Sequence, residues 1–304
     1  MTWQTVSPVP QELGESPFWH PHEKMLYWVD IACKKIVRTD ALGGTVQTWA
    51  MPTEPGCIAP AKNGGLVIAM RHGVFRAQEW AGELKQIATL DYDPAISRAN
   101  DGKCDAQGRF WVGTVDESKA HRNASLFSID CASPGPAVVQ RKAGNALTGN
   151  GLAWSPDGST LYWADTSNHV IHAWDYEPHG NTLATHRIYL QFAPKPQGWT
   201  FENLSYQGRP DGAAVDVLGN YYTAMYEGRL VCKFAPDGTL LAEMPTPAQC
   251  PTMVCFGGDD LKTLYLTSRR HGRSTAELEA LPLSGCVFAM RVEVPGLPVN
   301  FFVD

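Results

Sequence analysis

Four side chains that carry oxygen donors recur at matching places in the sequence. Each lies ten or eleven residues before the start of a strongly apolar segment, and the four are Glu15, Asn100, Asn150 and Asp211. Two carboxylates and two amide oxygens form a hard donor set that suits Ca²⁺, Mg²⁺ or Mn²⁺. Three such ligands leave coordination positions open for water and a substrate oxygen, as Lewis-acid catalysis requires. The pattern therefore indicates a divalent-cation site.

Two further apolar segments are preceded at about the same place by Cys57 and Met253, so four of six repeats supply oxygen donors. Arg98 lies two residues before Asn100, and on a β-strand this spacing puts both side chains on one face. A structural alternative stays open for each residue taken alone, because Asn-Gly and Asp-Gly pairs are also turn signals. The shared place in the repeat favours a common ring.

The elements that must position these side chains repeat six times. The apolar segments lie at residues 26–30, 66–70, 110–114, 161–165, 221–225 and 264–268, and their starts are 40 to 60 residues apart. Each segment precedes a third strand and a more polar fourth strand. Six units of four strands predict an all-β fold, a six-bladed β-propeller formed by residues 1–304 as one domain. A two-sheet sandwich with irregular spacing is the alternative.

The first strand of each propeller blade lines the central channel, so the aligned residues are expected to face that channel. Longer gaps predict insertions around residues 191–209 and 269–284, and only residues 274–281 have a helical pattern. The second insertion begins with a basic segment, residues 269–273. This segment is either a solvated loop or a surface that meets an anionic substrate at the mouth.

Composition excludes several classes of function. The formal net charge of −6 offers no basic surface for nucleic acid or anionic lipid. No apolar run approaches the roughly 18 residues that span a bilayer, and no secretory signal pattern opens the sequence. Eight cysteines without a C-x-x-C pair predict reduced thiols in the cytoplasm. The H-E-x-x-H, G-x-S-x-G and dinucleotide-binding motifs are also missing.

Four motifs resemble those of the senescence-marker-protein/gluconolactonase family, the regucalcin-like sugar lactonases. They are GESPFW (14–19), RANDGKCDAQGRFWVGT (98–114), NGLAWSPDGSTLYWADT (150–166) and RPDGAAVDVLGNYY (209–222), and the resemblance runs from about residue 13 to 288. It implies a six-bladed propeller with one divalent metal ion in the channel. By resemblance, Glu15, Asn150 and Asp211 hold the metal, and Asp211 is also the catalytic base. Arg98 and Asn100 would bind the substrate.

One position departs from the family pattern. After Gly113-Thr114 the family often has Met followed by acidic residues that contact substrate, whereas this chain has VDES at 115–118. We choose Glu117 for that substrate contact. The departure bears on sugar specificity more than on the reaction.

The resemblance implies a metal-dependent hydrolase of carbohydrate metabolism. It would open a sugar-acid lactone, such as glucono-, galactono-, arabino- or xylonolactone, to the free aldonic acid. Ca²⁺ is the expected ion, with Zn²⁺, Mn²⁺, Mg²⁺ and Fe²⁺ as alternatives, in a monomer or weak dimer without nucleic-acid or membrane partners. Two other functions stay open: a phosphotriesterase or other esterase at the same site, and a calcium-binding propeller without turnover.

Overall fold

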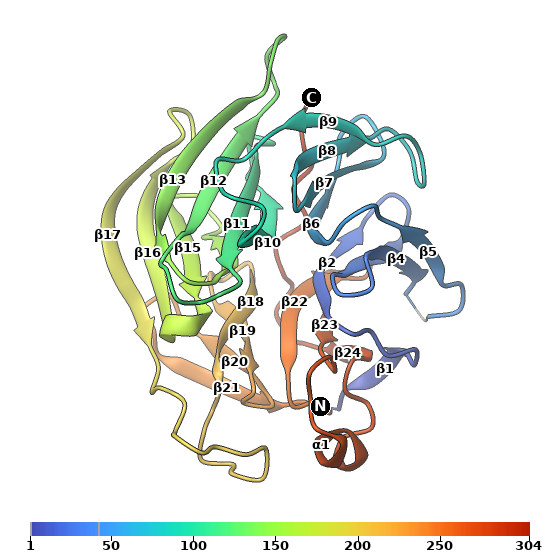
Figure 1. Cartoon of the computed structure of the whole chain (residues 1–304), viewed down its shortest axis with the longest axis vertical. Coiled ribbons are helices and arrows are strands. Elements are labelled where there is room, and N and C mark those ends of the chain that lie inside the picture. The colour runs from blue at the N-terminus through green and yellow to red at the C-terminus, as the bar shows by residue number, and fades with distance from the viewer. Residues whose placement is uncertain (1, 42) are drawn as a thin grey trace.

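The structure is a computed structural model that describes residues 2–41 and 43–304. Its strands form six four-stranded sheets that surround a central channel as the blades of a propeller (Figure 1). The predicted all-β architecture with six four-stranded blades is confirmed. The first strand of each blade contacts the first strands of its neighbours, so these six strands line the channel.

Blades 1 to 3 are built from consecutive strands. Blade 1 contains β2 (Gly14–His20), β3 (Met25–Asp30), β4 (Lys35–Asp40) and β5 (Gln47–Ala50). Blade 2 contains β6 (Pro55–Pro60), β7 (Leu66–Met70), β8 (Gly73–Ala77) and β9 (Lys85–Ala88). Blade 3 contains β10 (Ser97–Cys104), β11 (Phe110–Asp116), β12 (Ala124–Asp130) and β13 (Val138–Ala146).

Blades 4 and 5 follow the same order, whereas blade 6 combines both ends of the described chain. Blade 4 contains β14 (Gly149–Trp154), β15 (Thr160–Asp165), β16 (Val170–Glu177) and β17 (Thr182–Gln191), with a short 3-10 helix, η1 (Thr166–Asn168), after β15. Blade 5 contains β18 (Arg209–Val215), β19 (Tyr221–Tyr226), β20 (Leu230–Phe234) and β21 (Leu240–Pro245). Blade 6 contains β22 (Pro251–Gly257), β23 (Thr263–Ser268), β24 (Val287–Arg291) and β1 (Gln4–Ser7).

The six apolar segments of the sequence form the second strand of each blade. Trp28, Trp111 and Trp163 in these strands are at most 1% exposed. Each second strand packs against a neighbouring blade on both of its faces. Both faces are therefore apolar, and the alternation of apolar and polar residues that marks a half-exposed strand does not occur. Burial of each large apolar side chain contributes about 1.5–3 kcal/mol. The core of the protein therefore lies between the blades.

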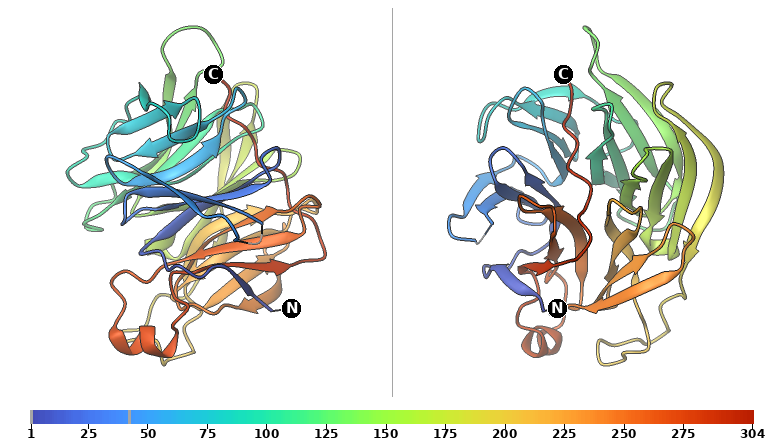
Figure 2. Two further views of the ribbon diagram at one scale, coloured as in Figure 1. Left: turned by 90° about the vertical axis from the view of Figure 1, so that its right-hand side faces the viewer. Right: turned by 180° about the vertical axis from the view of Figure 1, so that it is seen from behind.

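Blade 6 is closed by the N-terminal strand. β1 pairs with β24, with Gln4 opposite Ala289 and Thr5 opposite Phe288. The expectation that a fourth strand follows the third along the chain is therefore wrong for this blade. The chain after β24 instead crosses the propeller, where Gly296 bridges to Asp216 and Phe302 bridges to Ala61. Figure 2 shows this tail from behind, running across the centre of the molecule.

Both predicted insertions are present. Residues 192–208 connect β17 to β18 without a strand, and residues 269–286 connect β23 to β24 through α1 (Thr275–Ala280). The Ser274 hydroxyl caps this helix by accepting the backbone N–H of Glu277 at 3.2 Å. Within the part of the chain that the structure describes, no helix has the length and apolar character needed to cross a membrane.

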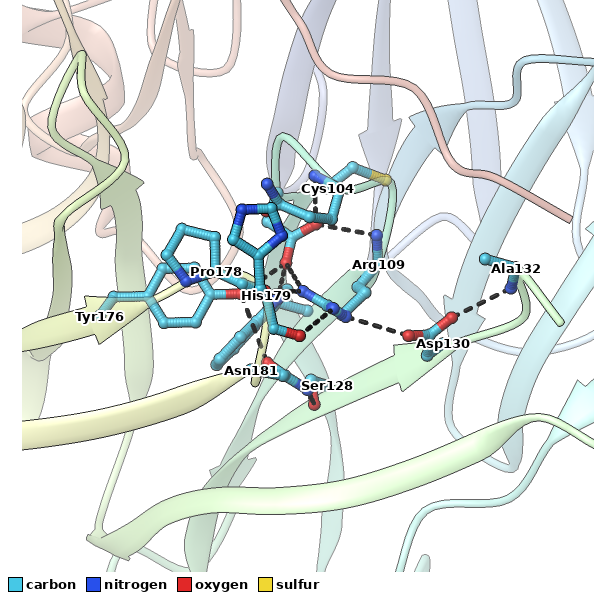
Figure 3. A network of polar contacts seen from close by, with 12 residues as sticks. Cys104, Arg109, Ser128, Asp130, Ala132, Tyr176, Pro178, His179 and Asn181 are labelled. Carbon is cyan, nitrogen blue, oxygen red and sulfur yellow. Dashed lines mark hydrogen bonds and ion pairs between the residues drawn. The ribbon is translucent and has the colours of Figure 1, made fainter.

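A largely buried polar network joins blades 3 and 4 (Figure 3). The Tyr176 hydroxyl donates to Asp105 Oδ2 at 2.8 Å, and Trp111 Nε1 donates to the same oxygen at 3.0 Å. Arg109 pairs with Asp105 at 3.3 Å and with Asp130 at 3.0 Å. Because Asp105 is almost fully buried, its charge depends on these partners.

We expect Tyr176→Phe to lower the free energy of unfolding by about 1–3 kcal/mol, because it leaves the buried carboxylate one donor short. Urea denaturation monitored by fluorescence measures the loss. Tyr162→Phe is the matched control, since Tyr162 is buried in the same blade and its hydroxyl has no hydrogen-bond partner among the described residues. Equal losses in both variants would show that the network adds nothing to stability.

Candidate functional site

Every innermost strand carries a β-bulge at the same level of the channel. The pairing with the second strand shifts register between Glu15 and Phe18, Pro55 and Cys57, Ala99 and Gly102, Asn150 and Ala153, Pro210 and Ala213, and Pro251 and Val254. A bulge bends its strand and re-aims the side chains beside it. The bulges thus help to place the aligned polar residues, Glu15, Asn100, Asn150 and Asp211, at one end of the channel.

The Asn150-Gly151 and Asp211-Gly212 pairs lie in these bulges rather than in turns. Gly151 has a φ of 58°, and a Cβ on it would lie 2.5 Å from the Tyr221 hydroxyl. A Cβ on Gly212 would lie 2.3 Å from Met253 Cβ on the next blade. Glycine is therefore required here because neighbouring inner strands approach closely. The turn alternative does not hold for Asn150 or Asp211.

All six candidate site residues line a single cavity at one end of the channel. The cavity has a volume of about 1300 Å³, part of it open to solvent, and its walls include Glu15, Arg98, Asn100, Glu117, Asn150 and Asp211. Met253 lies elsewhere, on a second cavity of about 760 Å³ that the C-terminal tail also lines. Cys57 is fully buried and lines neither cavity.

A chain of hydrogen bonds orients the amide side chains. Arg98 Nη1 donates to Asn100 Oδ1 at 2.8 Å, and Asn100 Nδ2 donates to Asn150 Oδ1 at 2.7 Å. Asn150 Nδ2 in turn donates to Thr166 Oγ1 at 2.8 Å. Each of the two amide nitrogens therefore has an acceptor. Asn150 Oδ1 accepts one hydrogen bond and keeps a second lone pair for a ligand.

Three buried carboxylates gather beside this chain. Burial raises the pKa of Asp211 to about 8, and the negative charge of Asp101 adds to the rise. Burial also raises the pKa of Glu15, as do the charges of Asp211 and Asp101. Asp211 Oδ1 and Asp101 Oδ1 are buried without a hydrogen-bond partner among the described residues. Nearby cationic side chains offset the rise for Asp211 only in part, so additional positive charge at the site would stabilise the ionised carboxylates.

The donor set of Glu15, Asn150 and Asp211 fits a hard divalent cation, because its donors are oxygen atoms and Asp211 Oδ1 has no hydrogen-bond partner in the part of the chain that the structure describes. Among residues 2–41 and 43–304, no three His, Cys, Asp or Glu side chains gather as a metal-binding group. Coordination of a cation here would therefore need the amide oxygen of Asn150 in addition to the two carboxylates. Glu15 and Asp211 supply those carboxylates.

Glu117 lies at the mouth of the cavity, held by two arginines. Arg71 Nη1 and Nη2 donate to its two oxygens at 2.8 and 3.1 Å, and Arg98 Nε lies 3.5 Å from Oε1. Arg71 also donates to Glu54 Oε2 at 2.9 Å. The Glu117 side chain keeps 40% exposure, so it can still meet a ligand.

Sequence reasoning missed Arg71, Thr166 and Tyr226, although a signal for them exists. The residue directly after each of the six apolar segments lines the cavity: Ile31, Arg71, Val115, Thr166, Tyr226 and Arg269. The second strands therefore end at the cavity wall as regularly as the first strands reach it. Lys119 and Arg209 also line the cavity. Lys119 lies in a loop outside the repeat alignment, whereas Arg209 lies two residues before Asp211, the same spacing as Arg98 before Asn100, so the alignment carried a signal for Arg209.

A model of the SMP-30/gluconolactonase/LRE-like region matches residues 13–270 of the sequence. The chain belongs to this family. As a family member it is 39% identical over 301 residues to a 6-deoxy-6-sulfogluconolactonase from Pseudomonas putida, with 99% of this chain and 98% of the relative covered. It is 31% identical over 294 residues to regucalcin from Gallus gallus, covering 94% and 93%.

Solved structures of SMP-30/gluconolactonase-like proteins share the architecture. A regucalcin from Agrobacterium tumefaciens, described as a calcium-binding protein, aligns with a TM-score of 0.89 at 22% identity, covering 99% of this chain and 97% of its own. This likeness confirms the six-bladed propeller. The family membership that the four motifs indicated is confirmed by the family match.

Proposed function

We propose that this protein is a lactonase that hydrolyses a sugar-acid lactone to the free aldonic acid. One observation carries the proposal: the buried Asp211 carboxylate, whose Oδ1 has no hydrogen-bond partner among the described residues, shares a cavity with Glu15 and with the hydrogen-bonded chain of Arg98, Asn100 and Asn150. The relative of 39% identity, whose name refers to a sulfonated gluconolactone, supports this substrate class.

Glu15, Asn150 and Asp211 would hold one divalent cation, with Ca²⁺ as the expected ion. When bound, the cation supplies Lewis-acid polarisation of the lactone carbonyl. Calcium suits a site with both carboxylate and amide oxygens that leaves room for water. The regucalcin from Agrobacterium tumefaciens is described as calcium-binding, which supports this choice.

Arg98 and Asn100 would hold the substrate. Arg98 Nη1 is occupied by Ala99 O and Asn100 Oδ1, and its Nε faces Glu117. Nη2 has no partner among the described residues, so it can donate to a lactone oxygen. Glu117 would accept a hydroxyl of the sugar with the lone pairs that Arg71 leaves free. These contacts orient the ring against Asp211.

Asp211 would act on water. Its free Oδ1 accepts a proton as the water oxygen bonds to the carbonyl carbon. The ring C–O bond then breaks, and the proton passes to the departing ring oxygen, which becomes the hydroxyl of the aldonic acid. Water is consumed, and the carboxylic acid product is ionised at neutral pH.

A panel of five- and six-membered aldonolactones tests the proposal. Acid release is followed with a pH indicator in chelated protein and after Ca²⁺, Mn²⁺, Mg²⁺ or Zn²⁺ is restored. We expect turnover of at least one lactone well above the spontaneous rate, and its loss on chelation. Spontaneous rates with every lactone and every ion would reject the proposed function.

The stability of the protein at different pH values tests the cation site separately. The pKa of Asp211 lies at about 8 in the metal-free protein, against an ordinary value of 3.8. Between these values the folded state keeps a proton that the unfolded state has lost, so metal-free stability falls as pH rises from about 4 to about 8. A cation that binds the ionised carboxylate offsets this loss. We expect Ca²⁺ to raise the melting temperature more at pH 8 than at pH 5.

Differential scanning fluorimetry of chelated and Ca²⁺-loaded protein measures these shifts. Asp211→Asn is the control, because it lacks the titrating carboxylate and should lose most of the pH dependence. An equal Ca²⁺ effect at both pH values in the wild type would place the cation away from Asp211.

A further inference from the structure

Three cationic side chains from different blades meet at one side of the cavity mouth. We call them the cationic rim: Lys119 follows β11, Arg209 begins β18 and Arg269 follows β23. Arg209 and Arg269 both lie over the Tyr226 ring, with guanidinium carbons 4.9 and 5.9 Å from its centre. One aromatic side chain thus orients two of the three cations toward the same opening.

The cationic rim has few carboxylate neighbours among the described residues, and the buried Asp211 carboxylate is near enough to interact electrostatically with all three cations. Lys119 and Arg269 make no ion pair within the described ranges, 2–41 and 43–304. Arg269 donates through Nε to a backbone carbonyl, that of His271, at 2.9 Å. Arg209 reaches Glu227 Oε2 at 3.3 Å, and its buried Nε has no hydrogen-bond partner among the described residues.

The carboxylate that Arg209 contacts is already shared. Glu227 also pairs with Lys195 at 2.8 Å and with Arg273 at 3.0 Å, so three cations surround one buried acid. Lys195 belongs to the insertion after β17 and Arg273 to the insertion before α1. Both insertions therefore fix Arg209 in place without neutralising the cationic rim.

The part of the mouth formed by blades 2 and 3 also carries paired charges. There Arg71 and Arg98 face Glu54 and Glu117, with N···O distances from 2.8 to 3.5 Å. The two parts of the mouth thus offer different chemistry to one ligand. The part with paired charges suits neutral hydroxyls, whereas the cationic rim suits a negative group.

The positive charge of the rim is a local feature, because the chain as a whole carries a net charge of −6. Partial desolvation lowers the pKa of Lys119, and the nearby charges of Arg209 and Arg269 lower it further. Like charges gathered in this way repel one another, and an anion placed among them relieves the repulsion. Lysine and arginine together also supply the donors that a tetrahedral oxyanion accepts.

We propose that Lys119, Arg209 and Arg269 bind an anionic group carried by the lactone, a sulfonate or phosphate on its exocyclic carbon. The proposal rests on the proposed function for the placement of the lactone ring beside Asp211. It makes an anionic sugar lactone the preferred substrate over its neutral counterpart. The basic segment at residues 269–273 then contributes Arg269 to substrate binding rather than forming a purely solvated loop.

The test compares three δ-lactones that share one ring: gluconolactone, 6-phosphogluconolactone and 6-deoxy-6-sulfogluconolactone. The value of kcat/KM is measured for wild type, Lys119→Gln and Arg269→Gln at low and high ionic strength. We expect wild type to prefer an anionic lactone by at least about tenfold, and each variant to reduce that preference by about tenfold. The preference should also weaken at high salt. The two anionic lactones distinguish a sulfonate from a phosphate site.

Arg270→Gln is the matched control, because it removes the same charge from the same loop. Arg270 does not line the cavity and lies 3.9 Å from Glu12, so this variant should keep the wild-type preference. A wild type without preference, or a preference that both rim variants retain, would overturn the proposal while leaving lactone hydrolysis intact.

Calorimetry of the product acids separates the two proposals further. Gluconate, 6-phosphogluconate and 6-deoxy-6-sulfogluconate are titrated into the same proteins. Tighter binding of a 6-substituted acid, lost in Arg269→Gln and kept in Arg270→Gln, would support the anion site even if no lactone is hydrolysed. Equal binding of all three acids would count against it.

Discussion

We expect the Asp211→Asn variant to lose about 10²- to 10⁴-fold in kcat at saturating divalent cation. The substitution keeps the shape of the side chain and one oxygen donor, but an amide cannot take a proton from water at neutral pH. Asp211 Oδ1 has no hydrogen-bond partner among the described residues, so the carboxylate is free for this role. Stopped-flow or indicator assays of lactone hydrolysis measure the loss.

Glu15→Gln distinguishes a base from a ligand. Glu15 shares the cavity with Asp211 but is assigned only to the cation, so this variant should bind the cation more weakly and regain activity when excess cation is added. Asp211→Asn should not regain it. Near wild-type kcat in Asp211→Asn would show that the water is activated without this carboxylate, and the proposed mechanism would be wrong.

Arg98→Ala should lower kcat/KM for a lactone by about 10²-fold. The Arg98 side chain anchors the Asn100 amide at 2.8 Å, and Asn100 in turn contacts Asn150. Its removal takes away a donor to the substrate and also frees the amide that orients Asn150. Because the side chain lies in the channel rather than between blades, the melting temperature should change little.

Arg98→Lys provides the comparison for charge. Lysine keeps the positive charge but lacks the planar fork that spans Asn100 and the substrate, so it should recover only part of the activity. Full activity in Arg98→Lys would show that only the positive charge of Arg98 matters. Unchanged kinetics in Arg98→Ala would remove Arg98 from the substrate site.

The blades were predictable because each one repeats the same physical constraint. A second strand with a neighbouring blade on both faces must be apolar throughout, and the segments at 66–70 and 161–165 show this directly. Alignment of the six repeats identified the positions that face the channel. The structure brings four of these residues, Glu15, Asn100, Asn150 and Asp211, into one cavity. Their roles as ligands, base and substrate contacts remain predictions.

Other features depend on contacts that no local pattern encodes. The four residues of β1 carry no repeat signature, and their partner β24 lies at the other end of the chain. Arg71 pairs with Glu54 of its own blade and with Glu117 of the next blade. The bulge at Asn150 looks like a turn signal in the sequence, because glycine serves both geometries. Only the way in which the blades pack around the channel decides between a bulge and a turn at this position.

The pairing of β1 with β24 also sets the order of events during synthesis. β1 leaves the ribosome long before its partner, because β24 is complete only when Arg291 has been added. Until β1 pairs with it, the edge of β24 stays open. Joining segments so far apart costs about 5 kcal/mol of chain entropy on the logarithmic loop-closure scale. The closing pair must therefore form last, on blades that have already folded, and variants that weaken β1 should accumulate as open rings prone to pair with another chain.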